Sequence, residues 1–259
     1  MIKESIRTLD VTRYLVPLRE GGSLPAIVEG QDGYMYVLKF RGAGQGVKAL
    51  IAELIGGELA RALELNVPEL VFMNLEEGFA KTEADEEIQD LLKFSVGLNL
   101  GMSFLSTALT YDPVASVADS FTASVVVLLD SLLTNIDRTH RNTNLLNWNK
   151  ELWLIDHGAS LYFHHAMNNW EEHAQRGFPM IKDHVLLERA TQLDEAASFI
   201  WEKLSDPLLD TLISWIPDDW LVEEGSALSP EERRKIYTQF IKIRLSRLEF
   251  LKKEAQDAR

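Results

Sequence analysis

The segment from residue 137 to residue 156 contains acidic and amide side chains whose types and spacing could do chemistry. Asp137, Asn142 and Asn144 lie in one polar run, and Asp156 follows a short apolar segment. A carboxylate orients or deprotonates an attacking hydroxyl, and oxygen ligands hold Mg²⁺ against nucleotide phosphates, because hard cations prefer oxygen donors. These residue types indicate phosphoryl transfer, with Asp137 suited to the hydroxyl and Asn144 with Asp156 suited to the metal.

The segments around this run predict a helix followed by a β-hairpin. Residues 114–133 are apolar on most sides of a helix, which is typical of a buried central helix. Residues 145–148 and 152–155 flank the turn Asn149-Lys150 and predict two antiparallel strands. Because Asp137, Asn144 and Asp156 fall at the same end of this hairpin, we expect their side chains to converge.

The first hundred residues predict a small β-rich region with one strong helix. Strands are expected at 14–18, 24–29, 34–40, 70–75 and 98–105, the first three as an antiparallel meander. The helix is expected from Val47 to Leu65, and the acidic run 83–90 is typical of a solvated helix face. The rest of the chain is mostly helical, so the fold class is α+β.

Two glycine-rich loops compete as phosphate-binding segments. Gly21-Gly22-Ser23 separates the first two expected strands, and residues 42–46 (Gly-Ala-Gly-Gln-Gly) precede the helix at Val47. The N-terminus of a helix attracts anions, which favours the second loop, whereas the first has the position of a kinase glycine-rich loop. Neither matches a Walker A pattern, because no Gly-Lys-Ser/Thr follows.

The order of these features resembles the HipA-like branch of the protein-kinase-like superfamily. A strand lysine, a helix glutamate, a buried helix, an Asp…Asn loop, a hairpin and Asp156-His157-Gly158 follow one another from Gly21 to about His165. The resemblance implies a two-lobed protein-kinase-like fold. A small β-rich N-lobe with one helix would span residues 1–105, and a larger, mostly helical C-lobe with the catalytic loop would span residues 106–259.

The same resemblance implies roles for individual residues. Asp137 becomes the catalytic-loop aspartate, and Asp156 becomes the metal-binding aspartate of the Asp-x-Gly motif. Lys39 becomes the lysine that grips the nucleotide phosphates. Its helix partner would be Glu53, with Glu58 as the second choice.

The resemblance also assigns the nucleotide contacts. Gly21-Gly22-Ser23 would cover the phosphates, and backbone groups near Met102 to Phe104 would meet the adenine at a hinge. His140, inside the catalytic loop, would orient that loop or contact phosphate. Arg138 and Arg141 either offset negative charge on the catalytic aspartate and the phosphates or are simply exposed.

One metal ligand has two candidates. The usual kinase spacing of five residues after the catalytic aspartate selects Asn142, whereas the position immediately before the expected strand selects Asn144. We favour Asn144, which implies a two-residue insertion in the loop, and Asn142 is the alternative.

The resemblance implies an ATP- and Mg²⁺-dependent phosphotransferase that moves the γ-phosphate of ATP to a hydroxyl. We expect this hydroxyl to belong to a Ser or Thr of a protein. A partner protein encoded elsewhere is also expected. The alternative is a catalytically silent kinase-fold module that binds a nucleotide or a partner. The retained lysine, asparagine and both aspartates argue against that alternative. A metal-dependent hydrolase that uses the acids without the lysine is a third option.

The composition limits partners and location. The chain has 40 acidic and 26 basic residues and a net charge of −14, so no direct contact with nucleic acid is expected. No run of about 20 apolar residues lacks a charge or a turn former, which predicts no membrane span. The absence of cysteine excludes disulfides and thiolate sites, and a cytoplasmic location is the default expectation.

Overall fold

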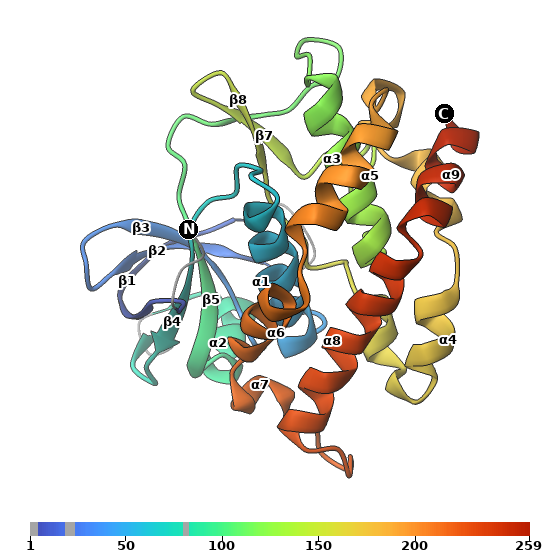
Figure 1. Cartoon of the computed structure of the whole chain (residues 1–259). Helices are drawn as coiled ribbons and strands as arrows, with labels where there is room; N and C mark the ends of the chain where they lie inside the picture. Colours follow the sequence, from blue (N-terminus) through green and yellow to red (C-terminus); the bar gives the residue numbers. More distant parts are fainter. Residues whose placement is uncertain (1–4, 19–23, 80–82) are drawn as a thin grey trace.

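The computed structural model describes residues 5–18, 24–79 and 83–259 (Figure 1). The first part of the described chain forms a closed barrel with the strand order β1-β2-β3-β5-β4. The strands are β1 (Thr8–Pro17), β2 (Ala26–Gly30), β3 (Met35–Lys39), β4 (Leu70–Leu75) and β5 (Gly97–Ser103). Neighbouring strands are antiparallel except β1 and β4, whose parallel pairing closes the barrel.

Alternating burial explains why these segments form strands. In β2, Ala26 and Val28 are buried while the residues between them are partly exposed, and β3 buries Tyr36 and Leu38 in the same way. A period of two places one face of each strand in the barrel core. The predicted antiparallel meander of the first three strands is confirmed, although β1 begins at Thr8 and not at Tyr14. Closure by a parallel pair is not visible in the local pattern.

Two helices accompany the barrel, α1 (Val47–Ala62) and α2 (Glu86–Phe94). The expectation of one helix in this region is therefore wrong. The acidic run continues into an amphipathic helix, because Asp85 caps α2 by accepting a hydrogen bond from the Glu87 N–H. Ile88 and Leu92 are buried in the barrel core on the other face of α2.

The rest of the described chain is mainly helical. At its centre α3 (Ser120–Leu133) is buried along almost its whole length and contacts α5, α8 and α9 (Figure 1). The α-helices after α3 are α4 (Trp170–Gln175), α5 (Leu193–Lys203), α6 (Asp206–Ser214), α7 (Asp218–Leu221), α8 (Pro230–Ser246) and α9 (Leu248–Ala258). Short 3₁₀ helices are η2 (Tyr162–His165), η3 (Met167–Asn169), η4 (Pro179–Asp183) and η5 (Leu187–Arg189).

The central helix is shorter than predicted. Asp119 caps α3 by accepting hydrogen bonds from the N–H groups of Phe121 and Thr122, so residues 114–119 lie outside the helix. The predicted hairpin is confirmed as β7 (Leu145–Trp148) and β8 (Glu151–Leu154), joined at one edge by β6 (Leu109–Thr110). Its turn residues have positive φ angles of 52° and 68°, as a tight hairpin turn requires.

Two apolar cores stabilise this arrangement. One fills the barrel and includes Val28, Leu38 and Met73. The other joins α1 and parts of β4 and β5 to the helical region, with Leu54 of α1 and Leu129 of α3 in the same cluster. The helix α1 is therefore fixed to the helical region as well as to the barrel. No helix in the described ranges combines the length and apolar character needed to span a membrane.

Candidate active site

The catalytic-loop segment lies between the end of α3 and the start of β7, and its polar side chains meet there. The Asn142 side-chain amide donates to Asp137 Oδ2 over 2.7 Å, and the Asn144 amide donates to the same oxygen over 3.2 Å. The Asn144 amide also lies 3.5 Å from the backbone oxygen of Asp156. Asp137, both candidate asparagines and Asp156 are thus brought together at one end of the hairpin, and both asparagines remain candidates for the metal.

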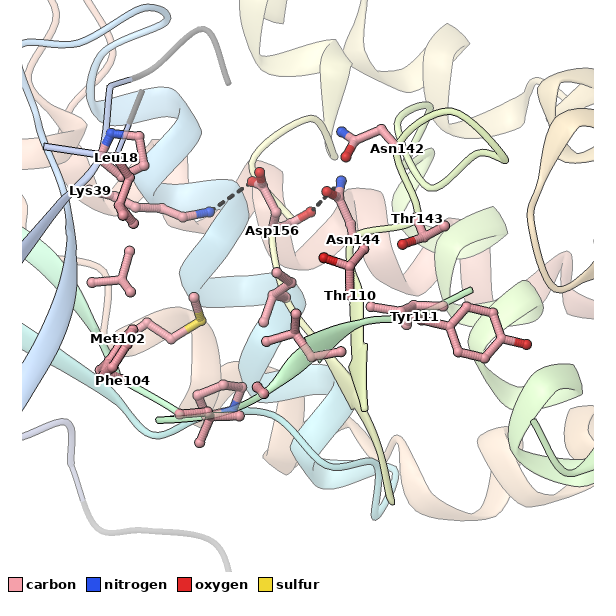
Figure 2. A pocket seen from close by; sticks show the side chains of 18 of the residues that line it. Leu18, Lys39, Met102, Phe104, Thr110, Tyr111, Asn142, Thr143, Asn144 and Asp156 are labelled. Atoms are coloured by element: carbon pink, nitrogen blue, oxygen red, sulfur yellow. Dashed lines mark hydrogen bonds and ion pairs between the residues drawn. The ribbon is translucent and has the colours of Figure 1, made fainter. Parts of the chain in front are cut away.

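Two of these residues have backbone conformations that few side chains adopt. Asn144 has φ 49° and Asp156 has φ 55°, both in the left-handed region. Asn and Asp tolerate this region better than most residues because their short polar side chains form local hydrogen bonds. The conformations turn both side chains toward the space in front of β3 (Figure 2).

Lys39, at the end of β3, lies between two carboxylates. Its Nζ is 2.6 Å from Glu53 Oε2 on α1 and 2.7 Å from Asp156 Oδ1. Glu58, the second-choice partner, instead pairs with Arg61 on its own helix over 3.1 Å. The segments that carry Lys39, Glu53 and Asp156 are far apart in the sequence, so the fold itself assembles this triad.

The short distances between Lys39, Glu53 and Asp156 decide the protonation states of Lys39 and Glu53. Burial alone lowers the pKa of Lys39, but the carboxylates of Asp156 and Glu53 outweigh this effect and hold it above its usual range. Burial alone raises the pKa of Glu53, but the Lys39 ammonium and the hydrogen bond from His157 hold it well below its usual range. Lys39 is therefore cationic and Glu53 anionic at neutral pH.

His157, between Asp156 and Gly158, is buried against α1. Its backbone N–H donates to Glu53 Oε2 over 2.8 Å, so this oxygen accepts from both Lys39 and His157. The imidazole Nδ1 lies 3.7 Å from Glu53 Oε1. The ring also packs over Gly56, where an added Cβ would lie 2.5 Å from the His157 Cβ. His157 therefore helps Lys39 to fix the position of the Glu53 carboxylate.

Arg138 does not face the catalytic aspartate or solvent, and both sequence-based expectations for it are wrong. It is 1% exposed, and its Nε donates to Asp130 Oδ2 of α3 over 2.6 Å. Its Nη1 donates to the backbone oxygens of Asn144 and Ile155. Arg138 is therefore an internal tie between α3, the catalytic loop and the strand that leads to Asp156.

Asp130 is the residue on which this tie depends. Its carboxylate also accepts from Asn135 Nδ2 over 3.0 Å and lies 2.9 Å from His184 Nε2. Burial alone raises the pKa of Asp130, but the Arg138 guanidinium and His184 reverse the effect and hold it below its usual range. The sequence contained a signal for this network. Asp130 is the charged residue of a largely apolar helix, and a buried charge requires a partner.

A cavity of about 950 Å³ opens in front of the triad. Lys39, Asp156 and both candidate asparagines line its polar end (Figure 2). His140, which is exposed, also lines the cavity. Its other walls are mostly apolar and include Val37, Met102, Phe104 and Leu146. Glu53 lies behind Lys39 and is 1% exposed. The cavity therefore combines an apolar slot with an end that carries charge.

The predicted adenine contacts fall on the apolar side of this cavity. Met102 belongs to β5 and pairs with Val37 of β3 and Leu70 of β4. The Phe104 N–H donates to the Met35 backbone oxygen over 3.0 Å and is therefore already occupied. Leu105 is the next residue along this wall. Its N–H has no backbone acceptor among the described residues.

The two glycine-rich loops have different positions. Gly21-Gly22-Ser23 lies outside the described residues, although its neighbours Leu18 and Pro25 line the cavity. The loop at 42–46 lines a separate cavity at the start of α1. The loop at 42–46 therefore does not face Lys39 across the 950 Å³ cavity.

The oxygen donors of the site suit a hard cation. Asp156 offers a carboxylate that is 46% exposed, and the Asn144 side chain lines the same cavity. Carboxylate and amide oxygens are the ligands that Mg²⁺ prefers. The described part of the chain contains no group of three or more His, Cys, Asp or Glu residues arranged to hold a metal. A metal here would therefore depend on one carboxylate, an amide and ligands from the substrate.

Comparison with solved structures supports a kinase-like fold. The Helicobacter pylori proinflammatory kinase CtkA has a TM-score of 0.59 and 10% identity, covering 98% of this chain and 97% of that chain. The Golgi casein kinase with Mn/ADP bound has a TM-score of 0.51 and 10% identity, covering 98% and 73%. Another Golgi casein kinase structure has a TM-score of 0.50 and 11% identity, with the same coverage. No curated protein matches the chain.

A family model described as HipA-like kinase matches residues 11–251. The match spans the barrel, α1, the catalytic loop and the hairpin, so it includes the whole candidate site. It agrees with the order of motifs in the sequence and with the kinase-like fold of the solved neighbours. The chain therefore belongs to the HipA-like kinase family, and the resemblance drawn from its motifs is confirmed.

Proposed function

We propose that the chain is an ATP- and Mg²⁺-dependent kinase that transfers the γ-phosphate of ATP to a hydroxyl of a protein Ser or Thr. The observation that carries the proposal is Lys39, held between Glu53 and Asp156 at the polar end of a large cavity. A cationic amine beside an exposed carboxylate is the arrangement that binds nucleotide phosphates in kinases. Membership of a kinase family supports the same reaction.

Each residue of the site has a part in this reaction. Lys39 exchanges its contact with Asp156 for the nucleotide phosphates, while Glu53 keeps the ammonium in place from behind. Asp137 accepts a hydrogen bond from the acceptor hydroxyl and takes its proton as the bond to phosphorus forms. The amides of Asn142 and Asn144 orient Asp137 Oδ2 until the substrate arrives.

The oxygens of Asp156 and Asn144 are the proposed metal ligands, with Asn142 as the alternative to Asn144. Mg²⁺ held there supplies positive charge that offsets the negative charge of the phosphates. The Golgi casein kinase, a structural neighbour, has Mn/ADP bound, which supports nucleotide and divalent metal use in this fold. Release of Asp156 from Lys39 frees its carboxylate for this role.

The nucleotide base belongs at the apolar end of the cavity. We place the adenine between Val37, Met102 and Leu146, with the N–H of Leu105 as its hydrogen-bond donor. Residues 1–105 are then the proposed nucleotide-binding lobe. Residues 106–259 form the lobe that carries the catalytic loop, whose His140 and Arg141 line the cavity where phosphate is transferred.

Phosphate incorporation tests this proposal. The wild-type chain, Asp137→Asn and Lys39→Met are incubated with labelled ATP, Mg²⁺ and a mixture of Ser- and Thr-containing proteins. We expect incorporation by the wild type and a loss on the order of 10²- to 10⁴-fold in Asp137→Asn, because the general base is removed. Thermal stabilisation by ATP without any incorporation would instead indicate a silent nucleotide-binding module.

A further inference from the structure

A second cavity, of about 530 Å³, lies at the start of α1 and shares no lining residue with the nucleotide cavity. Residues 44–48 form one side of it, and residues 220–223, Arg233 and Tyr237 form the other. In Figure 1, α7 and the lower part of α8 lie beside α1, and α7 contacts both helices. The glycine-rich loop at 42–46 therefore opens into a space of its own between α1 and the helical region.

The lining of this cavity is basic. Arg41 comes from the loop after β3 and pairs with Asp219 over 2.5 Å, Lys48 comes from the first turn of α1, and Arg233 comes from α8. Glu223 is the acidic residue among the lining side chains. The chain as a whole carries a net charge of −14, so a cavity with more cations than anions stands out. Cations gathered from three separate segments form a local field that attracts anions.

The N-terminus of α1 adds to this field. Gly46 caps the helix with φ 66° and no side-chain hydrogen bond, and the first turn contains no acidic residue. The first N–H groups of a helix carry partial positive charge and need acceptors. Here no side chain caps the helix, the Ala49 N–H donates to the Gly46 backbone oxygen over 3.2 Å, and Val47 and Lys48 of the first turn line the cavity.

Arg233 supplies an independent observation that a ligand is missing. Its side chain lines the cavity but is 3% exposed. Nη2 donates to Glu223 Oε2 over 2.6 Å, Nη1 is 3.3 Å from the sulfur of Met167, and Nε has no partner in the described part of the chain. A thioether is a weak acceptor, and an unpaired buried donor is costly. Within the described part of the chain this guanidinium therefore has one oxygen acceptor, the Glu223 carboxylate, whereas its planar donors favour several.

Glu223 marks where an anion would bind. It lies on the loop between α7 and α8, is 44% exposed, and bridges Lys48 over 2.8 Å and Arg233 over 2.6 Å. We propose that this cavity binds a phosphate group, as free phosphate or a phosphomonoester, which replaces the Glu223 carboxylate between Lys48 and Arg233. A phosphate dianion offers more charge and more acceptor oxygens than one carboxylate. Glu223 then swings out on its loop.

Bound phosphate connects this cavity to the candidate active site. Lys48 and Glu53 lie on the same helix, so an anion that ties α1 to α8 also fixes the helix that carries Glu53. This link to activity rests on the proposed function, whereas phosphate binding itself does not. Phosphate binding can therefore be tested even if the chain transfers no phosphate.

Isothermal titration of the full chain with inorganic phosphate and, separately, with O-phosphoserine tests the site. We expect saturable binding that Lys48→Met weakens about tenfold or more, because one charge-assisted hydrogen bond is lost. Glu223→Gln should bind more tightly, because the competing carboxylate is removed. Lys203→Met is the matched control, since Lys203 pairs with Glu64 and lines neither cavity.

The remaining outcomes separate the alternatives. Binding of both ligands indicates a phosphomonoester site, and binding of inorganic phosphate alone indicates a free-anion site. Lys39→Met should lose ATP binding but keep phosphate binding, which distinguishes this cavity from the nucleotide cavity. No saturable binding of either ligand, or a Glu223→Gln variant that binds no more tightly than wild type, would overturn the proposal and leave Glu223 as a salt bridge that joins two helices.

Discussion

Lys39 joins two parts of the candidate site, because it contacts Glu53 of α1 and Asp156 of the Asp-x-Gly motif. Its two carboxylate partners differ in exposure: Glu53 is 1% exposed, and Asp156 is 46% exposed. The Glu53 carboxylate is buried and also accepts the His157 N–H, so separating it from Lys39 would leave an unpaired charge in an apolar environment. The exposed Asp156 carboxylate can instead exchange Lys39 for a metal. Glu53 is therefore the permanent partner of Lys39, and Asp156 is the exchangeable one.

Replacing Glu53 by Gln tests this asymmetry. Gln keeps the shape of the side chain but removes the charge, so Lys39 loses its permanent partner and turns toward Asp156. We expect kcat/KM for ATP to fall on the order of 10- to 100-fold, as for loss of a charge-assisted hydrogen bond. Glu58→Gln is the matched control, because Glu58 pairs with Arg61 on the same helix. Equal losses in the two variants would contradict a specific role for Glu53.

The sequence predicted the convergence of the polar residues better than their surroundings. Asp137, Asn144 and Asp156 converge because a hairpin must bring its flanking segments together, which local patterns reveal. Arg138 was misassigned because its side-chain partner Asp130 lies in another element, and burial of a charged loop residue has no local signature. Both Asn142 and Asn144 contact Asp137, so spacing alone does not separate them.

Helix α1 connects the barrel to the helical region, and two glycines allow its close packing. At Gly56 an added Cβ would lie 2.5 Å from the Cβ of His157, an atom fixed next to the backbone. At Gly57 it would lie 2.7 Å from Leu70 Cδ1, the end of a flexible side chain. Leu70 can turn away, whereas His157 moves only if the segment around Asp156 moves with it.

Alanine substitutions at these adjacent positions should therefore have opposite consequences. Gly56→Ala is expected to displace His157 and α1, and so to reduce both phosphate incorporation and stability. Gly57→Ala gains about 0.5–1 kcal/mol of helix propensity, which offsets the small shift of Leu70. Denaturant unfolding and phosphate incorporation, measured on both variants, check the pair. A Gly57→Ala variant as impaired as Gly56→Ala would contradict the proposed packing.

Elements were predictable where local patterns decide them. The strands, α1 and the β7–β8 hairpin follow from apolar alternation, helical periodicity and turn residues. The parallel pairing of β1 with β4 joins segments far apart in sequence, so no local pattern reveals it. The start of α3 was placed too early, because Val114 and Val117 are apolar but 93% and 75% exposed. Their apolar character mimics a buried helix face.

The molecule as a whole buries titratable histidines, and one of them, His184, pairs with Thr139 of the catalytic loop. His164 is 1% exposed, with Nδ1 3.1 Å from the hydroxyl of Tyr237, and burial lowers its pKa to about 3. Burial also lowers the pKa of His184, although Asp130 opposes the effect. Both rings favour the neutral form in the folded state, whereas in the unfolded chain each binds a proton near its ordinary pKa of 6.5. The folded chain therefore binds fewer protons at these two histidines than the unfolded chain does.

This difference in proton binding predicts how stability depends on pH. Because these folded-state pKa values lie below the unfolded value, the stability that the histidines contribute is complete above about pH 6.5 and declines as the pH falls. We expect the free energy of unfolding to fall by about 2 kcal/mol through His164 between pH 7 and pH 5, and His184 changes it in the same direction. Asp130 and Glu53 have depressed pKa values, so their contribution is lost only below about pH 4.5.

Denaturant unfolding of the full chain at a series of pH values from 7 to 5 measures this dependence. His164→Gln removes one titrating group and should flatten the curve, whatever its effect on stability at pH 7. His140→Gln, at an exposed position of the catalytic loop, is the matched control for replacing a histidine by glutamine. An unaltered slope in His164→Gln would show that the ring takes up its proton equally in the folded and unfolded chain, contrary to its burial.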